Sequence, residues 1–325
     1  MTTTFKKHYY FLLILILLFG VVFTSSVFAL TISPVKMELS GDPGQTLQNE
    51  FTLFNEQNNT ETLYSSVENF ESRGESGAPF FLPERVGLAT WIKTQEQVTL
   101  KPKETKTIPF SIIIPKNAEP GGHFAAILWG MTPPDAIGGG QVAIGGRLGV
   151  LILLKVSGEV KEGGGLLDFG GKEKQRFFSS LPITLNYRFN NIGGNRVVPL
   201  GEVKIKNSFG FTTTVLSANK NEGSVLPGSA RKFEVIWAPL EIPEDGFWSA
   251  VKTQWSDFHF GWYTARMNLV WGATNQTANA SYNFFIIPWQ LLLIIFIILA
   301  VFGFLGRMGL KKYNHYIITQ ARQQK

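Results

Sequence analysis

QVTLKPKETKTIPFSIIIP, residues 97–115, is the stretch that decides the fold. The stretch predicts two strands, one on each side of a charged turn at residues 101–104. The second half is rich in β-branched residues and ends at Pro115, which has no N–H to donate to a strand ladder. The stretch therefore predicts a β-hairpin.

Similar patterns lie on both sides of this hairpin. Further strands are predicted at residues 45–55, 62–70, 122–130 and 141–160. The apolar run 148–154 is too short to cross a membrane and predicts a buried strand. Several short strands separated by turns, with no helical crossover, indicate a β-sandwich.

A second region repeats these features. Its strands are predicted at residues 181–190, 201–207, 212–217, 230–237, 263–271 and 280–285. Between the two regions, residues 161–176 hold five glycines and seven charged residues, which indicates an interdomain linker or an exposed hairpin tip. We place the linker at 163–176. The prediction is an all-β chain with two immunoglobulin-like β-sandwich domains, at 30–162 and 177–283.

A third segment sets the topology. Residues 284–306, FFIIPWQLLLIIFIILAVFGFLG, carry no formal charge over 23 positions, which is enough for a transmembrane helix. The alternative is the buried helix of a globular core. Trp289 is the predicted outer interface anchor, and Arg307, Lys311 and Lys312 mark the cytoplasmic side at the start of a basic tail, 307–325.

The N-terminus predicts export. Residues 1–29 combine Lys6 and Lys7 with an apolar run at 11–23 and a small residue, Ala29, as in a signal peptide. Retention as an uncleaved anchor is the alternative. Either way, residues 30–283 lie outside the cell membrane, in the extracellular or periplasmic space, and the C-terminus is cytoplasmic. The lipid bilayer is thus a predicted partner.

Charge and cysteine content exclude several classes of function. The chain has 30 basic and 24 acidic residues, but two basic residues lie in the signal and five in the tail. The exported part keeps 23 basic and 24 acidic residues, so the basic balance reflects topology, and nucleic acid is not a predicted partner. With no cysteine, the domains have no disulfides or thiolate metal sites and depend on their hydrophobic cores.

Few residues suggest catalysis. The exported part has two histidines, His123 and His259, and Asp257 near the second gives two potential metal ligands where three or four are needed. No G-x-S-x-G motif is present, and the glycine-rich residues 138–149 lack the Gly-Lys-Ser/Thr ending of a phosphate loop. We therefore expect no catalytic residue, no metal and no cofactor, although paired carboxylates for glycan hydrolysis depend on spatial distance.

Aromatic residues give the candidate site. Six of the eight tryptophans fall between Trp237 and Trp289, and Trp248, Trp255 and Trp262 follow one another at intervals of seven. A helix could place these three on one side. Three explanations stay open: an insertion packed on the core, an aromatic surface that binds carbohydrate or protein, and contact with the membrane surface.

A family resemblance follows from several short motifs. A turn precedes FTLFN at 51–55, a Val-Thr-Leu-turn-Thr-Ile-Pro-Phe hairpin follows, and Pro-Gly-Gly at 120–122 leads into AAILWG. Over roughly residues 31–160 this resembles the peptidoglycan-binding domain of the bacterial WxL-interacting surface proteins. The resemblance implies a signal, two immunoglobulin-like domains, one span and a short basic tail, with a host-binding second domain.

These observations predict a non-catalytic, membrane-anchored bacterial cell-surface protein for binding or adhesion. Its expected partner is a cell-wall polymer such as peptidoglycan, or another surface protein, bound through the sandwiches. Two alternatives stay open: a membrane-tethered hydrolase of envelope glycan, and a periplasmic assembly or chaperone module.

Overall fold

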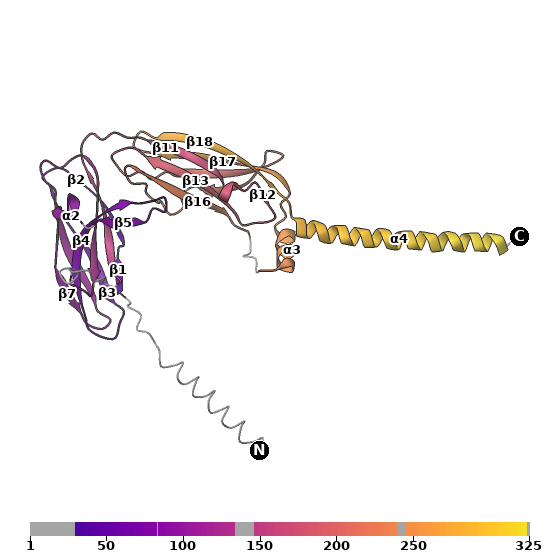
Figure 1. Cartoon of the computed structure of the whole chain (residues 1–325), viewed down its shortest axis with the longest axis horizontal. Coiled ribbons are helices and arrows are strands. Elements are labelled where there is room, and N and C mark those ends of the chain that lie inside the picture. The colour runs from indigo at the N-terminus through magenta and orange to yellow at the C-terminus, as the bar shows by residue number, and fades with distance from the viewer. Residues whose placement is uncertain (1–29, 83, 134–145, 240–244, 324–325) are drawn as a thin grey trace, which may run out of the picture. The chain divides into compact units, whose positions relative to one another are not determined.

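The computed structural model describes residues 30–82, 84–133, 146–239 and 245–323 (Figure 1). The predicted signal, 1–29, and the first five residues of the strand predicted at 141–160 lie outside this part. The described chain forms two compact units. Unit 1 ends at Ser157 and unit 2 starts at Gly158, but unit 2 also includes two short earlier segments, Glu71–Phe81 and Pro120–Gly122.

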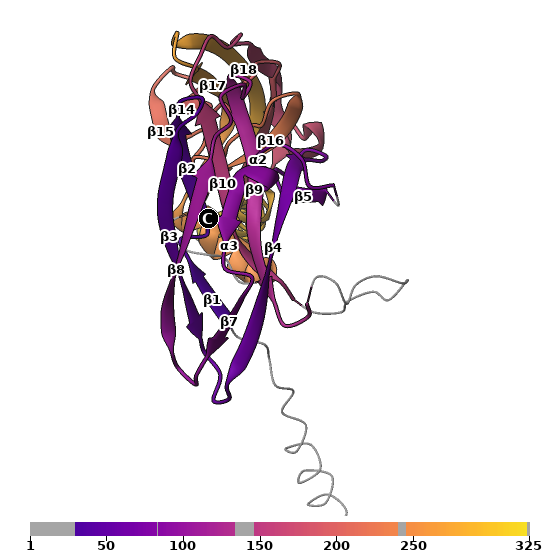
Figure 2. The same ribbon diagram turned by 90° about the vertical axis from the view of Figure 1, so that its left-hand side faces the viewer.

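The strands before Gly158 form a sandwich of two sheets. One sheet has the strand order β1-β3-β8-β6 and the other β2-β10-β9-β4-β5, with β7 pairing β4. Figure 2 shows β10, β9 and β4 running beside one another. The bounds are β1 Leu30–Ser33, β2 Lys36–Gly41, β3 Thr46–Asn55, β4 Glu61–Ser72, β5 Pro79–Leu82, the short helix α2 Leu88–Trp91, β6 Ile92–Thr94, β7 Gln97–Leu100, β8 Thr105–Ile113, β9 Gly121–Gly130 and β10 Leu148–Val156.

The predicted hairpin is β7 and β8, but its strands belong to different sheets. β7 pairs β4, whereas β8 lies between β3 and β6. Pro109 is tolerated inside β8 because the short strand β6 pairs only as far as Phe110. Beyond that point one edge of β8 is open, which is where a proline can stand in a sheet.

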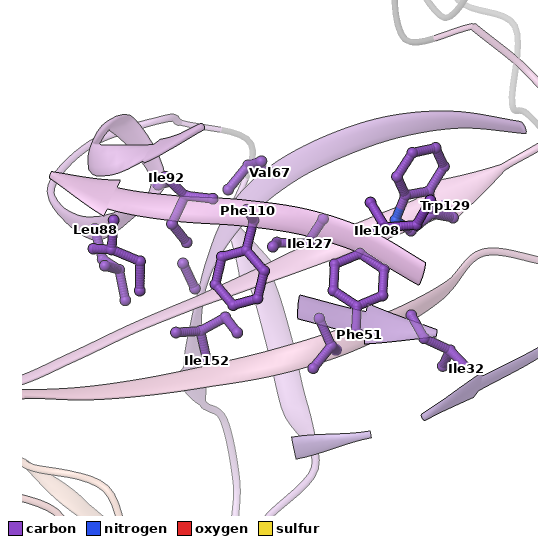
Figure 3. Packing of buried hydrophobic residues seen from close by; sticks show 14 of the residues in the cluster. Ile32, Phe51, Val67, Leu88, Ile92, Ile108, Phe110, Ile127, Trp129 and Ile152 are labelled. Carbon is purple, nitrogen blue, oxygen red and sulfur yellow. The ribbon is translucent and has the colours of Figure 1, made fainter. Parts of the chain in front are cut away.

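The core of the first sandwich is mainly aliphatic, with a few large rings. Phe51, Phe110 and Trp129 lie close together in Figure 3. The ring centroid of Phe51 lies 5.9 Å from that of Phe110 and 6.4 Å from that of Trp129. These side chains come from both sheets, so the core holds the two layers together by apolar burial.

The second unit is another two-sheet sandwich. Its sheets have the orders β11-β13-β16 and β12-β18-β17-β14-β15. The bounds are β11 Gly164–Gly171, the 3-10 turn η2 Lys172–Lys174, β12 Phe177–Phe178, β13 Ile183–Asn191, β14 Leu200–Asn207, β15 Thr212–Ser217, β16 Ser229–Trp237, the helix α3 Phe247–Ser256, β17 Gly261–Trp271 and β18 Gln276–Ile286.

The second core is richer in aromatic rings than the first. Tyr187 and Phe233 stack with centroids 4.9 Å apart, and Phe189 meets Trp271 edge-on at 5.0 Å. Phe284 is fully buried. Alternation along β13, where every second residue from Ile183 to Asn191 is buried, confirms the strand period expected from the sequence.

The chain ends in the helix α4, Trp289–Gln323. Its segment Trp289–His315 has a mean hydropathy of 2.7 in its most apolar window, so it is long and apolar enough to cross a membrane. Only 6% of that window is buried inside the described structure. The described chain thus confirms the predicted fold class: all-β, with two sandwiches and one helix of transmembrane type. The low burial contradicts the alternative, in which this segment is the buried helix of a globular core.

Two predicted boundaries are wrong. The linker placed at 163–176 is largely strand β11, which pairs β13 from Gly164 to Gly171 and forms an edge of the second sandwich. Its glycines allow close approach: a Cβ on Gly164 would lie 2.5 Å from the carbonyl oxygen of Asn190. The span placed at 284–306 starts too early, because residues 284–286 complete β18, and the helix runs through the predicted tail.

Candidate functional site

The candidate site lies at the junction of the second sandwich with α4. Only Ile287 and Pro288 stand between β18 and the helix. The Ile287 amide donates to the Phe178 carbonyl at 2.8 Å, so the chain stays hydrogen-bonded to β12 up to the last residue before Pro288. The helix therefore leaves the sandwich without a free linker.

One buried amide joins α3 to the first turn of α4. Gln254 is 2% exposed; its Nε2 donates to the Ser179 carbonyl at 3.2 Å and to Gln290 Oε1 at 2.5 Å. Its Oε1 accepts from the Leu291 amide at 2.9 Å. The first amides of a helix lack partners within the helix, so Gln254 caps α4 from outside. Figure 1 shows α3 beside the start of α4.

Exposed aromatic rings surround this junction. We call the following set the aromatic collar: Phe177, Trp248, Trp255, Phe258, Phe260 and Trp262. They come from β12, α3, the loop after α3 and the start of β17. Phe285 at the end of β18 links several of them, with ring centroids 5.0 Å from Trp262, 5.9 Å from Phe260 and 6.4 Å from Phe177.

The three predicted tryptophans all lie in the collar, but only two share a helix. Trp248 and Trp255 lie on α3 and are 71% and 73% exposed. Trp262 lies on β17 and is 54% exposed, so the interval of seven does not place all three on one helical face. With such exposure, none of the three forms the core insertion considered as one explanation.

The predicted membrane anchors lie along α4. Trp289, the first residue of α4, is exposed, and its ring centroid lies 6.2 Å from that of Phe247. Arg307, Lys311 and Lys312 are exposed further along the helix. At about 1.5 Å per residue, Trp289 and Arg307 are roughly 27 Å apart, close to the roughly 30 Å of a hydrocarbon core.

The two histidines of the region predicted to be exported are both in contact with aromatic rings. His259 lies in a loop, and its ring meets Trp237 edge-on at 4.7 Å. Its Nδ1 lies 3.0 Å from the Asp257 carbonyl and 3.4 Å from a carboxylate oxygen of the same residue. His123 on β9 lies against Trp91 at 4.8 Å. Within the described ranges, no group of three His, Asp or Glu residues could hold a metal ion.

Each sandwich also has a shallow hollow on its surface. The hollow of the first sandwich measures about 430 Å³ and is lined by Gln48, Asn49, Lys93, Thr94, Gln95, Pro109, Phe110 and Ser111. The hollow of the second measures about 340 Å³ and lies over β14, β17 and β18, with Lys204, Arg266, Asn268 and Asn279 among its lining residues. Thr94 Oγ1 is buried and has no hydrogen-bond partner among the described residues.

Glu75 and Tyr187 are two of the groups of the second unit that have shifted pKa values. Arg188 donates from Nε to both carboxylate oxygens of Glu75, at 2.8 and 3.0 Å, and this hydrogen bonding lowers the pKa of Glu75. Burial raises the pKa of the Tyr187 hydroxyl well above its ordinary value. Neither group lies in the collar or in a hollow, so both shifts belong to the structure of the sandwich.

Sequence reasoning missed Gln254 and the two hollows. A glutamine inside an aromatic segment gives no sign that it is buried, because its three partners lie far away in sequence: Ser179 in a loop, and Gln290 and Leu291 at the start of α4. The hollow residues are ordinary polar positions on strands. Only the register of neighbouring strands, such as Gln48 opposite Ser111, brings them together.

Comparisons with known proteins give weak matches. No protein-family profile and no curated protein matches the chain. Among solved structures, the class 5 fimbriae chaperone CfaA is 11% identical with a TM-score of 0.37, covering 78% of this chain and 99% of that one. The CsuC–CsuE chaperone–tip subunit pre-assembly complex of Acinetobacter baumannii is 10% identical with a TM-score of 0.37, and the match covers 78% of this chain and 98% of that one. The PapD-like domain 7 of human CEP192 is 12% identical with a TM-score of 0.28, and the match covers 40% of this chain and 86% of that one. Matches at this level say nothing of ligand or activity.

Proposed function

We propose that the chain is an exported, membrane-anchored binding protein without catalytic activity, similar in plan to the WxL-interacting surface proteins. The junction at Gln254 carries the proposal. A helix long and apolar enough to cross a bilayer follows the last strand after two residues and is capped by a buried side chain of the sandwich. Such a junction holds the second sandwich against the outer face of the membrane, as a protein that presents binding surfaces requires.

The proposed ligand is a cell-wall polymer, and the hollow of the first sandwich supports it. Gln48 and Gln95 supply amides, and Lys93 supplies a cation. These groups match the hydroxyl and acetamido groups of a peptidoglycan chain, which both donate and accept hydrogen bonds.

The test uses the full chain in nanodiscs, mixed with purified peptidoglycan and pelleted. We expect the wild-type chain to sediment with the polymer and the Gln48→Ala/Gln95→Ala variant to lose most of this retention. The matched control is Asn268→Ala/Asn279→Ala in the other hollow, which we expect to bind like the wild type. Absence of wild-type retention, or equal retention by all three, would refute wall binding through this hollow.

An assembly module that binds a partner protein by strand addition is a second candidate. The edge strand β15, TTTVLS, contains no charged residue and pairs only β14 in its sheet. Native edges are commonly protected by charges, and an unprotected edge is a template for another strand. Val215→Lys should then abolish co-purification with a surface protein and leave peptidoglycan retention unchanged. Co-purification that survives this substitution would exclude the β15 edge.

A further inference from the structure

The end of the second sandwich next to α4 presents a further pair of exposed rings. Phe209 and Phe211, in the turn between β14 and β15, are 84% and 71% exposed. Ring exposure of this degree in water is unfavourable, because each apolar ring keeps its surface hydrated. A turn of this kind needs no aromatic residue for its own geometry. These rings therefore call for a partner outside the sandwich.

Hydrogen bonds place this turn beside the aromatic collar. Asn207, the last residue of β14, pairs with Tyr263 of β17, and Ser208 Oγ donates to the Trp262 carbonyl at 2.9 Å. Asn207 Oδ1 accepts from the amides of Phe209 and Phe211, both at 3.1 Å. The turn thus has a fixed shape next to Trp262.

The strand directions bring all these segments to one end. β18 runs toward α4, so the end of β14, the start of β15 and the start of β17 lie at the same end of the sheet. β12 pairs β18 in parallel at Phe285 and Ile286, which adds Phe177 to this end. Four separate segments therefore present aromatic rings where the chain enters α4.

Helix α3 contributes an interfacial face. Trp248, Lys252 and Trp255 are exposed and spaced by four and three residues, so they lie on one side, while Gln254 is buried. Tryptophan and lysine on one face of a short helix are typical of a helix that lies in the plane of a membrane interface. Tryptophan is favoured there because its ring is apolar and its N–H remains hydrated.

We infer that the collar and the Phe209–Phe211 turn insert into the lipid headgroup interface and seat the second sandwich on the bilayer. The occupant is lipid because the surface is continuous with Trp289, the first residue of the apolar helix, through the contact of Phe247 with both Trp248 and Trp289. A second copy of the chain or a glycan would have to reach the same rings within a few residues of the hydrocarbon. The inference rests on the proposed function, since it requires α4 to cross the membrane.

The chain has no cysteine, so single cysteines can carry a nitroxide spin label without a background signal. Labels go on Phe209→Cys and Trp248→Cys at the proposed interface. A third goes on Lys220→Cys, an exposed position after β15 at the opposite end of the sandwich, and a fourth on Leu299→Cys in α4. Each full-length variant is placed in nanodiscs of phosphatidylcholine and phosphatidylglycerol. Collision with oxygen, which concentrates in lipid, is compared with collision with a water-soluble nickel complex.

We expect the oxygen-to-nickel ratio at positions 209 and 248 to exceed that at 220 severalfold, and the ratio at 299 to be the highest. Ratios at 209 and 248 equal to that at 220, with a lipid-buried label at 299, would refute the inference and leave the membrane anchor intact. A nickel-accessible label at 299 would refute the anchor and the inference together. Spin–spin broadening at 209 or 248 that disappears on dilution with unlabelled chain would show that a second copy covers the rings, and would also overturn it.

A second measurement needs no cysteine and guards against misfolding of the labelled variants. Brominated phospholipid quenches tryptophan that lies in the membrane interface. We expect the Trp248→Phe/Trp255→Phe variant to lose a large share of the quenchable emission of the wild-type chain. A quenched fraction that comes from Trp289 alone, unchanged in the double variant, would contradict the inference.

Discussion

The two ends of the second sandwich are made by the same strands but expose different side chains. At the end next to α4, the surface is aromatic. At the other end, the turns at 192–195, 219–223 and 272–275 are rich in Gly, Asn, Lys and Thr, with Ile192 as their exposed large apolar side chain. Among the described residues before α4, Phe80 is the one exposed Phe or Trp outside three places: the collar, α3 and the β14–β15 turn. The fold alone does not demand this difference, so it points to what each end contacts.

The two ends are alike beneath the surface. The four buried polar residues of the described chain are all amides: Asn55, Asn191, Asn219 and Gln254. Asn191 and Asn219 hold the turns of the far end, as Asn191 Nδ2 donates to the Val225 carbonyl at 2.9 Å. Gln254 does the same at the α4 end. Stability should therefore depend equally on both ends, whereas membrane contact should depend on one.

The largest expected effect comes from removing a core ring at either end. Phe284→Ala, next to α4, and Trp271→Ala, at the far end, should each lower the free energy of unfolding by about 3–5 kcal/mol, because each leaves a large cavity. Hydrogen exchange of the β17 and β18 amides in the full chain measures the loss. A loss of unfolding free energy below about 1 kcal/mol for one of the two variants would show that the core depends on its two ends unequally.

A smaller effect is expected at the buried amides. Gln254→Leu removes three hydrogen bonds and leaves the Leu291 amide and Ser179 carbonyl without this partner, at a cost of about 1–3 kcal/mol. The loss should appear as faster hydrogen exchange in α3 and the first turn of α4. Asn191→Leu is the matched control, since it should speed exchange in the far-end turn and leave α3 protected. Unchanged exchange in α3 would mean that Gln254 does not join the two helices.

The contrast between core and surface also explains how far the sequence predicts this molecule. Alternation along β3, β8, β13 and β17 indicated the strands because each buries one face, and the uncharged residues after 286 indicated α4. The strand β11 was missed since its glycines and charges resemble a linker, while its role depends on β13 beside it. Trp248, Trp255 and Trp262 stood out by composition, but their exposure depends on where α3 and β17 meet α4.

An intermediate, pH-dependent effect is expected between the ends, where Arg188 of β13 pairs with Glu75. The folded-state pKa of Glu75 lies below its unfolded value, so the pair contributes its full stability above the unfolded pKa. This contribution is lost as the pH falls through the lower, folded-state pKa. Both side chains are partly exposed, so the effect on the urea midpoint should be small.

The test compares urea midpoints of the full chain at neutral pH and near pH 3. Glu75→Gln should lower the midpoint at neutral pH and flatten its decline in acid. Glu234→Gln, a nearby carboxylate on β16, is the control and should keep the decline due to Glu75. A Glu75→Gln chain with the same acid dependence as the wild type would assign that dependence to other groups.

The smallest effect on folding is expected where the surface difference is greatest. Trp255→Ala should change the free energy of unfolding by no more than about 0.5 kcal/mol in detergent micelles, because a ring that is 73% exposed leaves no cavity when it is removed. The unfolded chain stays attached to the same micelle through α4, so lost contact with the micelle affects both states. Ile192→Ala at the far end is the matched surface control, and it should change the free energy of unfolding by a similarly small amount. A loss above about 2 kcal/mol for Trp255→Ala alone would make this ring part of the core. The two ends would then differ in packing rather than in the partner that each one contacts.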